Sequence, residues 1–193
     1  MVKGKVAVVT GLPGVGKSTV LNELERLAKQ ADKKVQIVNF GTIMLELAKK
    51  KEKNLTRDEI RLKPISFQHK LQANAANTIA KMAKGGSTLI VDTHMMVRTD
   101  SGYWAGLPIH VLKKLQPDFF VLIEAPPEEI LNRRISDKIR VRDKIKMEDV
   151  MEEIMVSRAF AATCGVLTGV PFKIVMNPTG KQVEAAENIV KLL

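Results

Sequence analysis

The sequence is poor in cysteine, in aromatic residues and in long apolar runs, and each shortage narrows the classes of protein to consider. The single cysteine, Cys164, excludes an intrachain disulfide and is expected to pack as a small side chain. Aromatic residues make up 4% of the chain, so base-stacking platforms for single-stranded nucleic acid are scarce. The first apolar stretch, Val6 to Val9, is too short for a signal peptide or a membrane span. A cytoplasmic protein without a membrane partner is therefore expected.

Positive charge, in contrast, is in excess, with 31 Lys and Arg against 21 Asp and Glu and a net charge of +10. Much of the excess lies in two clusters, at residues 49–53 and 133–146. A basic chain attracts phosphate in general, and a basic chain with few aromatics is better suited to the phosphates of a small molecule than to a nucleic acid. We expect no nucleic-acid partner.

The most informative motif is G-x-x-x-x-G-K-S at residues 11–18, which follows the apolar run 5–10 and precedes an amphipathic helix. Its glycines let successive backbone N–H groups converge on a phosphate, and the helix directs its positive dipole end to the same place. Lys17 is expected to reach the terminal phosphates, and the Ser18 hydroxyl to ligate Mg²⁺. The sequence predicts a nucleoside triphosphate site made of Gly11, Leu12, Pro13, Gly14, Val15, Gly16, Lys17, Ser18 and Thr19.

Strand and helix patterns alternate along one domain, residues 1–193, which predicts an α/β fold with a doubly wound parallel sheet. Two insertions exceed what a crossover needs, a helical one at about 42–84 and a short basic one at about 137–146, and both are candidate moving covers. The expected strands are 5–10, 35–40, 88–92, 118–123 and 171–176. The expected helices are 17–30, 42–53, 57–62, 65–84, 108–115, 127–137, 147–163 and 181–193.

Asp92 ends the apolar strand 88–92, which is the position of a Walker-B carboxylate that helps to hold Mg²⁺. His94, two residues later, is better interpreted as a hydrogen-bonded loop histidine than as a base, because transfer to a phosphate oxygen needs none. Thr42, after the second strand, is a good helix N-cap, and a helix start beside the phosphate loop suits an acceptor phosphate with Arg57 or Arg61 above it. Trp104 is expected to be buried rather than stacked on a base.

Arginines form the remaining cluster. Their planar forks pair bidentately with phosphate oxygens, and transfer between two polyphosphates gathers negative charge that cations must neutralise. Lys138, Lys144 and Lys146 are expected to be solvated. We expect at least two of five arginines to touch phosphate when the second insertion closes: Arg133, Arg134, Arg140, Arg142 and Arg158.

Six motifs together resemble the archaeal-type adenylate kinases, in order and along essentially the whole chain. They are residues 11–19, 38–42 (VNFGT), 91–94 (VDTH), 102–108 (GYWAGLP), 140–143 (RVRD) and 165–169 (GVLTG). The resemblance implies a P-loop NTPase three-layer sandwich with five parallel strands and helices on both faces, a helical AMP-binding insertion and a short lid. It also implies Mg²⁺-dependent transfer between ATP and AMP, and a homotrimer.

By this resemblance Lys17 is the catalytic lysine, and Thr42 and Arg61 are AMP-site residues. Arg134, Arg140, Arg142 and Arg158 resemble the lid arginines. Asp92 is assigned to the metal and to the AMP side. Bacterial and eukaryotic relatives carry an AMP-phosphate arginine in Asp-Gly-Phe-Pro-Arg, where this chain reads Asp92-Thr-His-Met-Met, and Arg98 is the candidate replacement.

The residues alone leave other classes open. A small P-loop kinase for another nucleoside monophosphate, or for a non-nucleotide acceptor such as shikimate, would share the core but need a different acceptor pocket. A switch GTPase would carry Asn-Lys-x-Asp and Asp-x-x-Gly, and neither tetrapeptide occurs. An RNA-binding protein with a vestigial loop would fit the charge but not an intact Lys17-Ser18.

Overall fold

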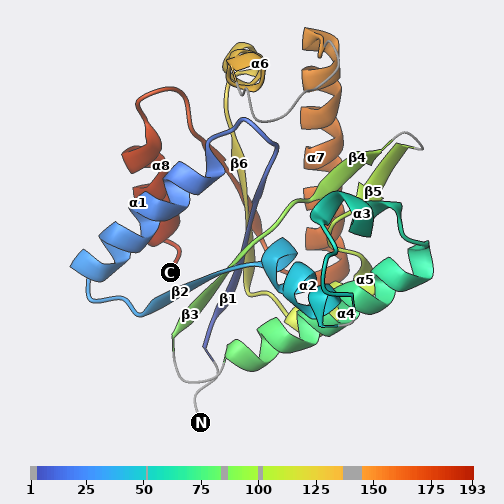
Figure 1. The fold of residues 1–193 in the computed structure, drawn as a ribbon. Coiled ribbons are helices and arrows are strands. Elements are labelled where there is room, and N and C mark those ends of the chain that lie inside the picture. Colours follow the sequence, from blue (N-terminus) through green and yellow to red (C-terminus); the bar gives the residue numbers. More distant parts are fainter. Residues whose placement is uncertain (1–3, 51, 84–86, 100–101, 137–144) are drawn as a thin grey trace.

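The computed structural model describes residues 4–50, 52–83, 87–99, 102–136 and 145–193, and these form a parallel five-stranded sheet with helices on both faces (Figure 1). The predicted fold class is confirmed. The strands are β1 (Val6–Gly11), β2 (Val35–Asn39), β3 (Thr88–Asp92), β4 (Met96–Thr99), β5 (Gly102–Ala105), β6 (Phe119–Glu124) and β7 (Phe172–Met176). The helices are α1 (Lys17–Gln30), α2 (Phe40–Lys49), α3 (Arg57–Leu62), α4 (Ile65–Met82), α5 (Ile109–Leu115), α6 (Pro127–Ser136), α7 (Met147–Thr168) and α8 (Gln182–Val190).

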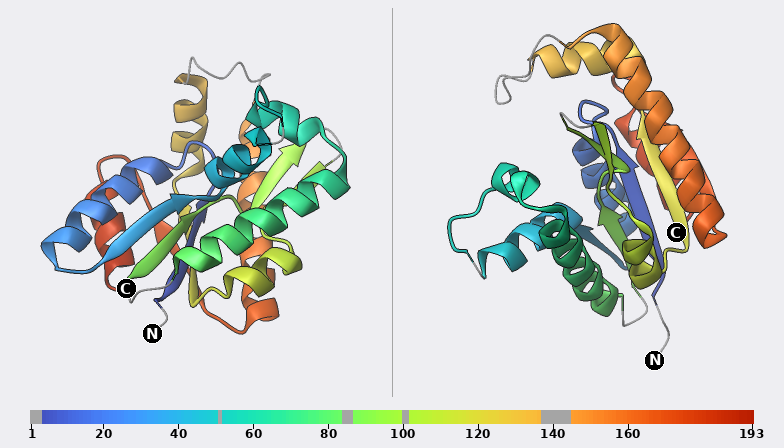
Figure 2. Two further views of the ribbon diagram at one scale, coloured as in Figure 1. Left: turned by 60° about the horizontal axis from the view of Figure 1, so that its bottom comes forward. Right: turned by 90° about the vertical axis from the view of Figure 1, so that its right-hand side faces the viewer.

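The main sheet has the strand order β2-β3-β1-β6-β7, with every neighbouring pair parallel. Every residue of its central strands β1 and β6 is buried, and most are apolar, because both faces of the sheet are covered. Ala7 and Val9 belong to the core under α1 and α8, whereas Val6 and Val8 belong to the core that α4 and α5 cover. Figure 2, right, shows α4, α5 and α7 in front of the sheet and α1 behind it. The result is a helix–sheet–helix sandwich.

The carboxyl edge of this sheet brings polar residues of several strands together. Asn39, the last residue of β2, lies in register with Asp92, the last residue of β3. Glu124 ends β6, and Asn177 directly follows β7. The loop after Gly11 of β1 leaves from the same edge, which is where ligands of such sheets bind.

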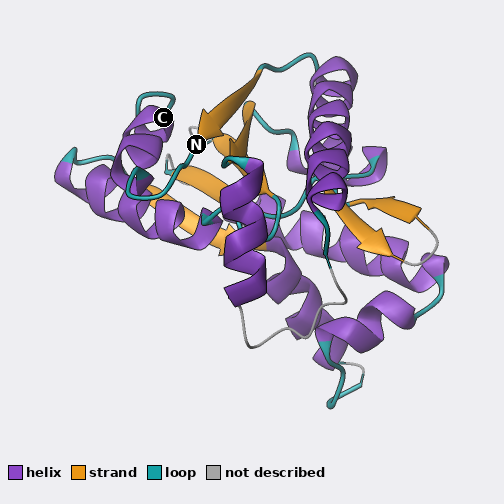
Figure 3. Cartoon of the chain, turned by 90° about the horizontal axis from the view of Figure 1, so that it is seen from above, coloured by secondary structure: helices purple, strands orange, loops and turns teal. Residues whose placement is uncertain are grey.

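Several local expectations were wrong: α7 continues to Thr168 beyond the expected end at 163, and α2 spans Phe40–Lys49 where a helix at 42–53 was expected. Residues 96–105 form an antiparallel β4–β5 hairpin, apart from the main sheet (Figure 3), where no strands were predicted. Helix α2 begins at Phe40, and its N-cap is Asn39 rather than Thr42: the Asn39 side chain accepts from the Thr42 backbone N–H. An amide oxygen three residues before the N–H reaches it without disturbing the helical turn, so the earlier residue takes the cap. Trp104 is half-buried on β5.

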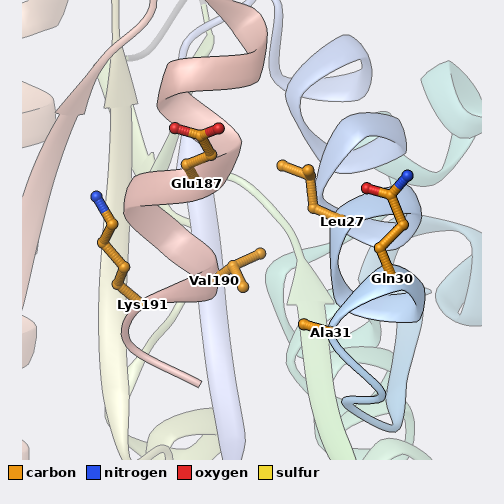
Figure 4. A pocket seen from close by; sticks show the side chains of 6 residues that line it. All are labelled: Leu27, Gln30, Ala31, Glu187, Val190 and Lys191. Atoms are coloured by element: carbon orange, nitrogen blue, oxygen red, sulfur yellow. The ribbon is translucent and has the colours of Figure 1, made fainter.

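Several other features lie away from the carboxyl edge. Cys164 is buried, as expected, and burial raises the pKa of its thiol to about 11. An open groove between α1 and α8 is lined by Leu27 and Val190 among others (Figure 4), at the opposite end of α1 from the phosphate loop. Among the helices that the structure describes, none combines the length and the apolar character needed to cross a bilayer.

The contact between α4 and α5 predicts an acid-sensitive stability. The ring centroids of His69 and His110 lie 5.1 Å apart. The pKa of His110 is lowered from its ordinary 6.5, chiefly by burial and also by the positive charges of His69 and Lys114. Below pH 6.5 the unfolded chain therefore takes up a proton before the folded chain does, and stability falls as the pH drops towards the folded pKa. His110→Leu should lose less Tm than the parent between pH 8 and pH 5.5 in thermal melts. An equal loss in both proteins would contradict this.

Candidate active site

The phosphate loop of residues 11–16 has the backbone conformation that an anion site needs. Gly14 and Gly16 have φ of 92° and 80°, in the left-handed region that side chains disfavour, and Gly16 is the N-cap of α1. Helix α1 begins at Lys17, and Ser18 and Thr19 in its first turn are accessible to solvent. Leu12 and Val15 are buried under the loop. The predicted loop-to-helix geometry is present, with its N–H groups at the positive end of a helix.

A series of polar contacts runs from the start of α1, after the phosphate loop, to the N-terminus of α2. The Lys17 ammonium pairs with Oδ1 of Asp92, and Asn39 Nδ2 donates to the other Asp92 oxygen at 2.6 Å. Asn39 Oδ1 in turn accepts from the Thr42 N–H at 2.9 Å and the Thr42 hydroxyl at 3.1 Å. Three predicted site residues, Lys17, Asp92 and Thr42, are therefore brought to one place, and Asn39 joins them.

Arg57, the first residue of α3, adds one more contact to this series. Its guanidinium donates to the Thr42 hydroxyl at 2.8 Å, at the N-terminus of α2. A cation and a helix N-terminus at one point suit an anionic group of an acceptor. Arg61 lies one turn further along α3, but its side chain, like the whole of Arg140 and Arg142, is outside the described part of the structure.

The remaining predicted arginines are each bound to carboxylates. Arg134, 5% exposed, donates to Glu153 at 2.7 Å and to the Pro13 carbonyl at 2.8 Å. Arg158, with 52% of its side chain exposed, makes two bonds to Glu124, and these raise its pKa above the ordinary value. Arg98 on β4 contacts Asp149 at 3.0 Å and Glu153 at 3.5 Å, both on α7. Each of these three arginines therefore has a protein carboxylate as a partner.

Ser18, which follows Lys17, and Asp92, which pairs with it, supply hard oxygen donors of the kind that Mg²⁺ prefers, a hydroxyl and a carboxylate. No cluster of three or more His, Cys, Asp and Glu side chains able to hold a metal forms within the described residues. Mg²⁺ usually keeps several waters and is held by one or two side chains together with substrate phosphates, so the donor set fits a metal that arrives with a nucleotide.

His94, as expected, is a bonded loop residue, and its Nδ1 lies 3.1 Å from the Gly11 carbonyl.

Three residues of the site were missed from the sequence: Asn39 as a bridge, Glu124 as the partner of Arg158, and Asn177, which donates to the Val15 carbonyl at 2.8 Å. All three stand at the ends of predicted parallel strands, as Asp92 does. The rule that ligands bind beyond the carboxyl ends of such strands could have found them.

Comparison with known proteins defines first a class and then a family. A family model described as an AAA domain matches residues 10–151. The solved shikimate kinase of Bacteroides thetaiotaomicron superposes with a TM-score of 0.60 at 13% identity over 97% of both chains. That of Acinetobacter baumannii, solved with shikimate, gives 0.60 at 13% over 98% of this chain and 92% of its own. The fold is that of the P-loop kinases.

Sequence relatives narrow the class. The adenylate kinase of Methanocaldococcus jannaschii is 41% identical over 191 residues, 99% of both chains. That of Pyrococcus horikoshii is 42% identical over 190 residues, 97% of this chain and 94% of its own. The chain belongs to the family of adenylate kinases that these archaeal proteins represent, and it is a phosphotransferase.

Proposed function

We propose that the chain catalyses reversible transfer of the terminal phosphoryl group of Mg-ATP to AMP, giving two ADP, and so balances the adenine nucleotides. The observation that carries this proposal is the chain of contacts Lys17–Asp92–Asn39–Thr42–Arg57, which joins a triphosphate-binding loop to a second anion-suited helix start. A transfer enzyme needs both substrates held at one edge, in line and away from water.

In this proposal Lys17 stabilises the transferring phosphoryl group, and Ser18 and Asp92 hold the metal that enters with ATP. The metal would neutralise charge on the phosphates. Thr42 and Arg61 bind AMP, together with Arg98 as the replacement for the arginine missing after Asp92. Arg134, Arg140, Arg142 and Arg158 gather on the phosphates. Arg158 is the best placed to exchange a carboxylate for a phosphate, because half of its side chain is exposed.

The test is a coupled assay for ADP with and without AMP, combined with calorimetry of a bisubstrate analogue, two adenosines joined by five phosphates. ADP should form only with AMP present, and the analogue should bind far more tightly than ATP, because linking the two ligands makes the second binding event intramolecular. Shikimate and other nucleoside monophosphates serve as acceptor controls. Equal affinity for the analogue and ATP would contradict a second nucleotide site beside the phosphate loop.

We also propose a cytoplasmic homotrimer, as the family resemblance implies, and we place the contact between copies on an apolar face at the sheet edge. Strand β7 is an edge strand, and Phe172, Ile174 and Met176 on one side of it are exposed. Met155 and Val166 of α7 are 69% and 84% exposed. At about 100° per residue their directions differ by about 20° around the helix axis, so both lie on one face of α7. Phe172 packs close to Gly165 of α7, so the two sets are neighbours.

An exposed apolar edge of this kind is a template for pairing with another chain. Sedimentation equilibrium should give three times the 21.4 kDa of one chain, and Ile174→Lys should shift the mass towards that of a single chain. Lys173→Glu on the same strand, pointing to the other face, is the control and should leave the mass unchanged. A parent protein that sediments as a single chain would contradict the trimer.

A further inference from the structure

Three consecutive carbonyls of the phosphate loop are bonded by side chains from distant parts of the chain. The Pro13 carbonyl accepts from Arg134 Nε at 2.8 Å, and the Gly14 carbonyl from Arg133 Nη1 at 3.2 Å. The Val15 carbonyl accepts from Asn177 Nδ2 at 2.8 Å. The donors come from α6, which lies above the loop in Figure 1, and from the turn after β7.

These bonds bear on phosphate binding because the N–H and C=O of one peptide unit point in opposite directions. A loop whose N–H groups converge on an anion must direct its carbonyls outward, and outward carbonyls without partners would favour a rotated peptide. Gly14 and Gly16 have no Cβ to oppose such a rotation, and both already adopt a left-handed φ. Donors on the carbonyl side therefore fix the orientation of the N–H groups without touching the ligand.

Asn177 is held in place by burial and by its neighbours. It is 4% exposed, its backbone N–H is anchored on the Glu124 carbonyl at 2.7 Å, and a Cβ at Gly16 would lie 2.6 Å from its Nδ2. The opposite orientation of the amide would place Oδ1 against the Val15 carbonyl oxygen, so the bond fixes it. Oδ1 is buried and has no partner among the described residues. A buried polar atom without a partner costs stability, so its presence needs another explanation. The hydrogen bond from the same amide to the Val15 carbonyl is that explanation.

Arg133 is anchored in the same way. Its Nη2 donates to Glu129 at 2.6 Å and to the Thr179 hydroxyl at 3.0 Å. Glu129 also accepts from the Thr179 N–H at 2.8 Å, which ties α6 to the turn after β7. The guanidinium that reaches the Gly14 carbonyl is therefore held in place from both sides.

We propose that Arg133 and Asn177 are positioning residues which hold the phosphate loop in its anion-receiving conformation by bonding its carbonyl side. The proposal rests on the assignment of this loop to the ATP phosphates. It also gives a role to Arg133, one of the five arginines of which the sequence led us to expect at least two on phosphate: this side chain acts through the Gly14 carbonyl.

The test uses Asn177→Leu, which keeps the shape of the side chain, and Arg133→Met, which keeps its unbranched apolar stem; both remove the hydrogen bonds. The KM for ATP should rise about tenfold in each, the factor expected from one lost hydrogen bond, while the KM for AMP stays within about twofold. Calorimetry with inorganic tripolyphosphate should show the same loss of affinity. Asn177→Leu should melt close to the parent, because it also removes the unpaired Oδ1. Arg26→Met is the matched control, an α1 arginine paired with Glu23 and remote from the loop.

Unchanged ATP and tripolyphosphate binding in both variants would overturn the proposal. So would an equal rise of both KM values together with a lower Tm, since that is the mark of a merely structural role. The tripolyphosphate measurement needs no acceptor, so it decides the proposal even if the parent makes no ADP from ATP and AMP, a result that would count against the proposed function alone.

Discussion

Replacing Lys17 by methionine should lower kcat by about 10²-fold or more, the largest loss expected from any single side chain of this protein. The ammonium is the cation at the start of α1 and pairs with Asp92 at the carboxyl edge of the sheet. When a triphosphate occupies the loop, this charge is expected to lie over the phosphates, where negative charge develops during transfer. Methionine keeps the length and the helix propensity but not the charge.

The same substitution should alter the fold little. Asp92 loses a cation but retains the bond from Asn39 Nδ2 at 2.6 Å. Steady-state kinetics with ATP and AMP varied in turn, with a thermal melt beside them, make the measurement. Lys29→Met, in the last turn of the same helix, is the control and should turn over like the parent. Turnover near the parent value in the Lys17 variant would end the kinase assignment of this loop.

The layers of the fold were predictable because their signals are local. Buried parallel strands are continuous apolar runs, and α1 and α3 begin and end at the predicted residues. The β4–β5 hairpin was missed because a strand of four residues is too short for its alternation of apolar and polar side chains to be recognised. Residues 102–108 were interpreted as a family motif and not as a strand. The N-cap of α2 was misplaced by three residues because both Asn39 and Thr42 are good caps, and only the backbone geometry selects one.

The site was predictable as far as its chemistry is local in sequence. The phosphate loop and Asp92 each follow a strand, and that position alone indicates their place. Pairings such as Arg158 with Glu124 join residues 34 apart, and no spacing rule finds them. The arginine run at 133–134 shows the limit most clearly. A guanidinium binds a carbonyl, a carboxylate or a phosphate with the same atoms, so the sequence indicated phosphate as the partner, while the structure shows a carboxylate and a loop carbonyl as partners of each arginine.

Arg134 gives the second large effect, and it separates stability from activity. Arg134→Met should lower the free energy of unfolding by about 3 kcal/mol, the lower end of what removal of one partner of a buried ion pair costs. Glu153, 8% exposed, would lose its bond at 2.7 Å, and its remaining ion pair among the described residues is the longer contact with Arg98 at 3.5 Å. For a chain of 193 residues this corresponds to a fall in Tm on the order of 10 °C. Activity should fall as well, because the Pro13 carbonyl loses its donor.

A second substitution at the partner distinguishes the two losses. Replacing both members of a buried pair by apolar side chains of similar size is often neutral, so Arg134→Met with Glu153→Leu should recover most of the lost Tm. The double variant should nevertheless remain slow, because nothing replaces the bond to the Pro13 carbonyl or a cation near the phosphates. Thermal melts and steady-state kinetics on the single and double variants decide between the roles. If the double variant regains full activity, Arg134 serves only to neutralise Glu153, and the cations near the phosphates must be sought among Arg140, Arg142 and Arg158. If Arg134→Met melts like the parent, the buried pair contributes nothing to stability.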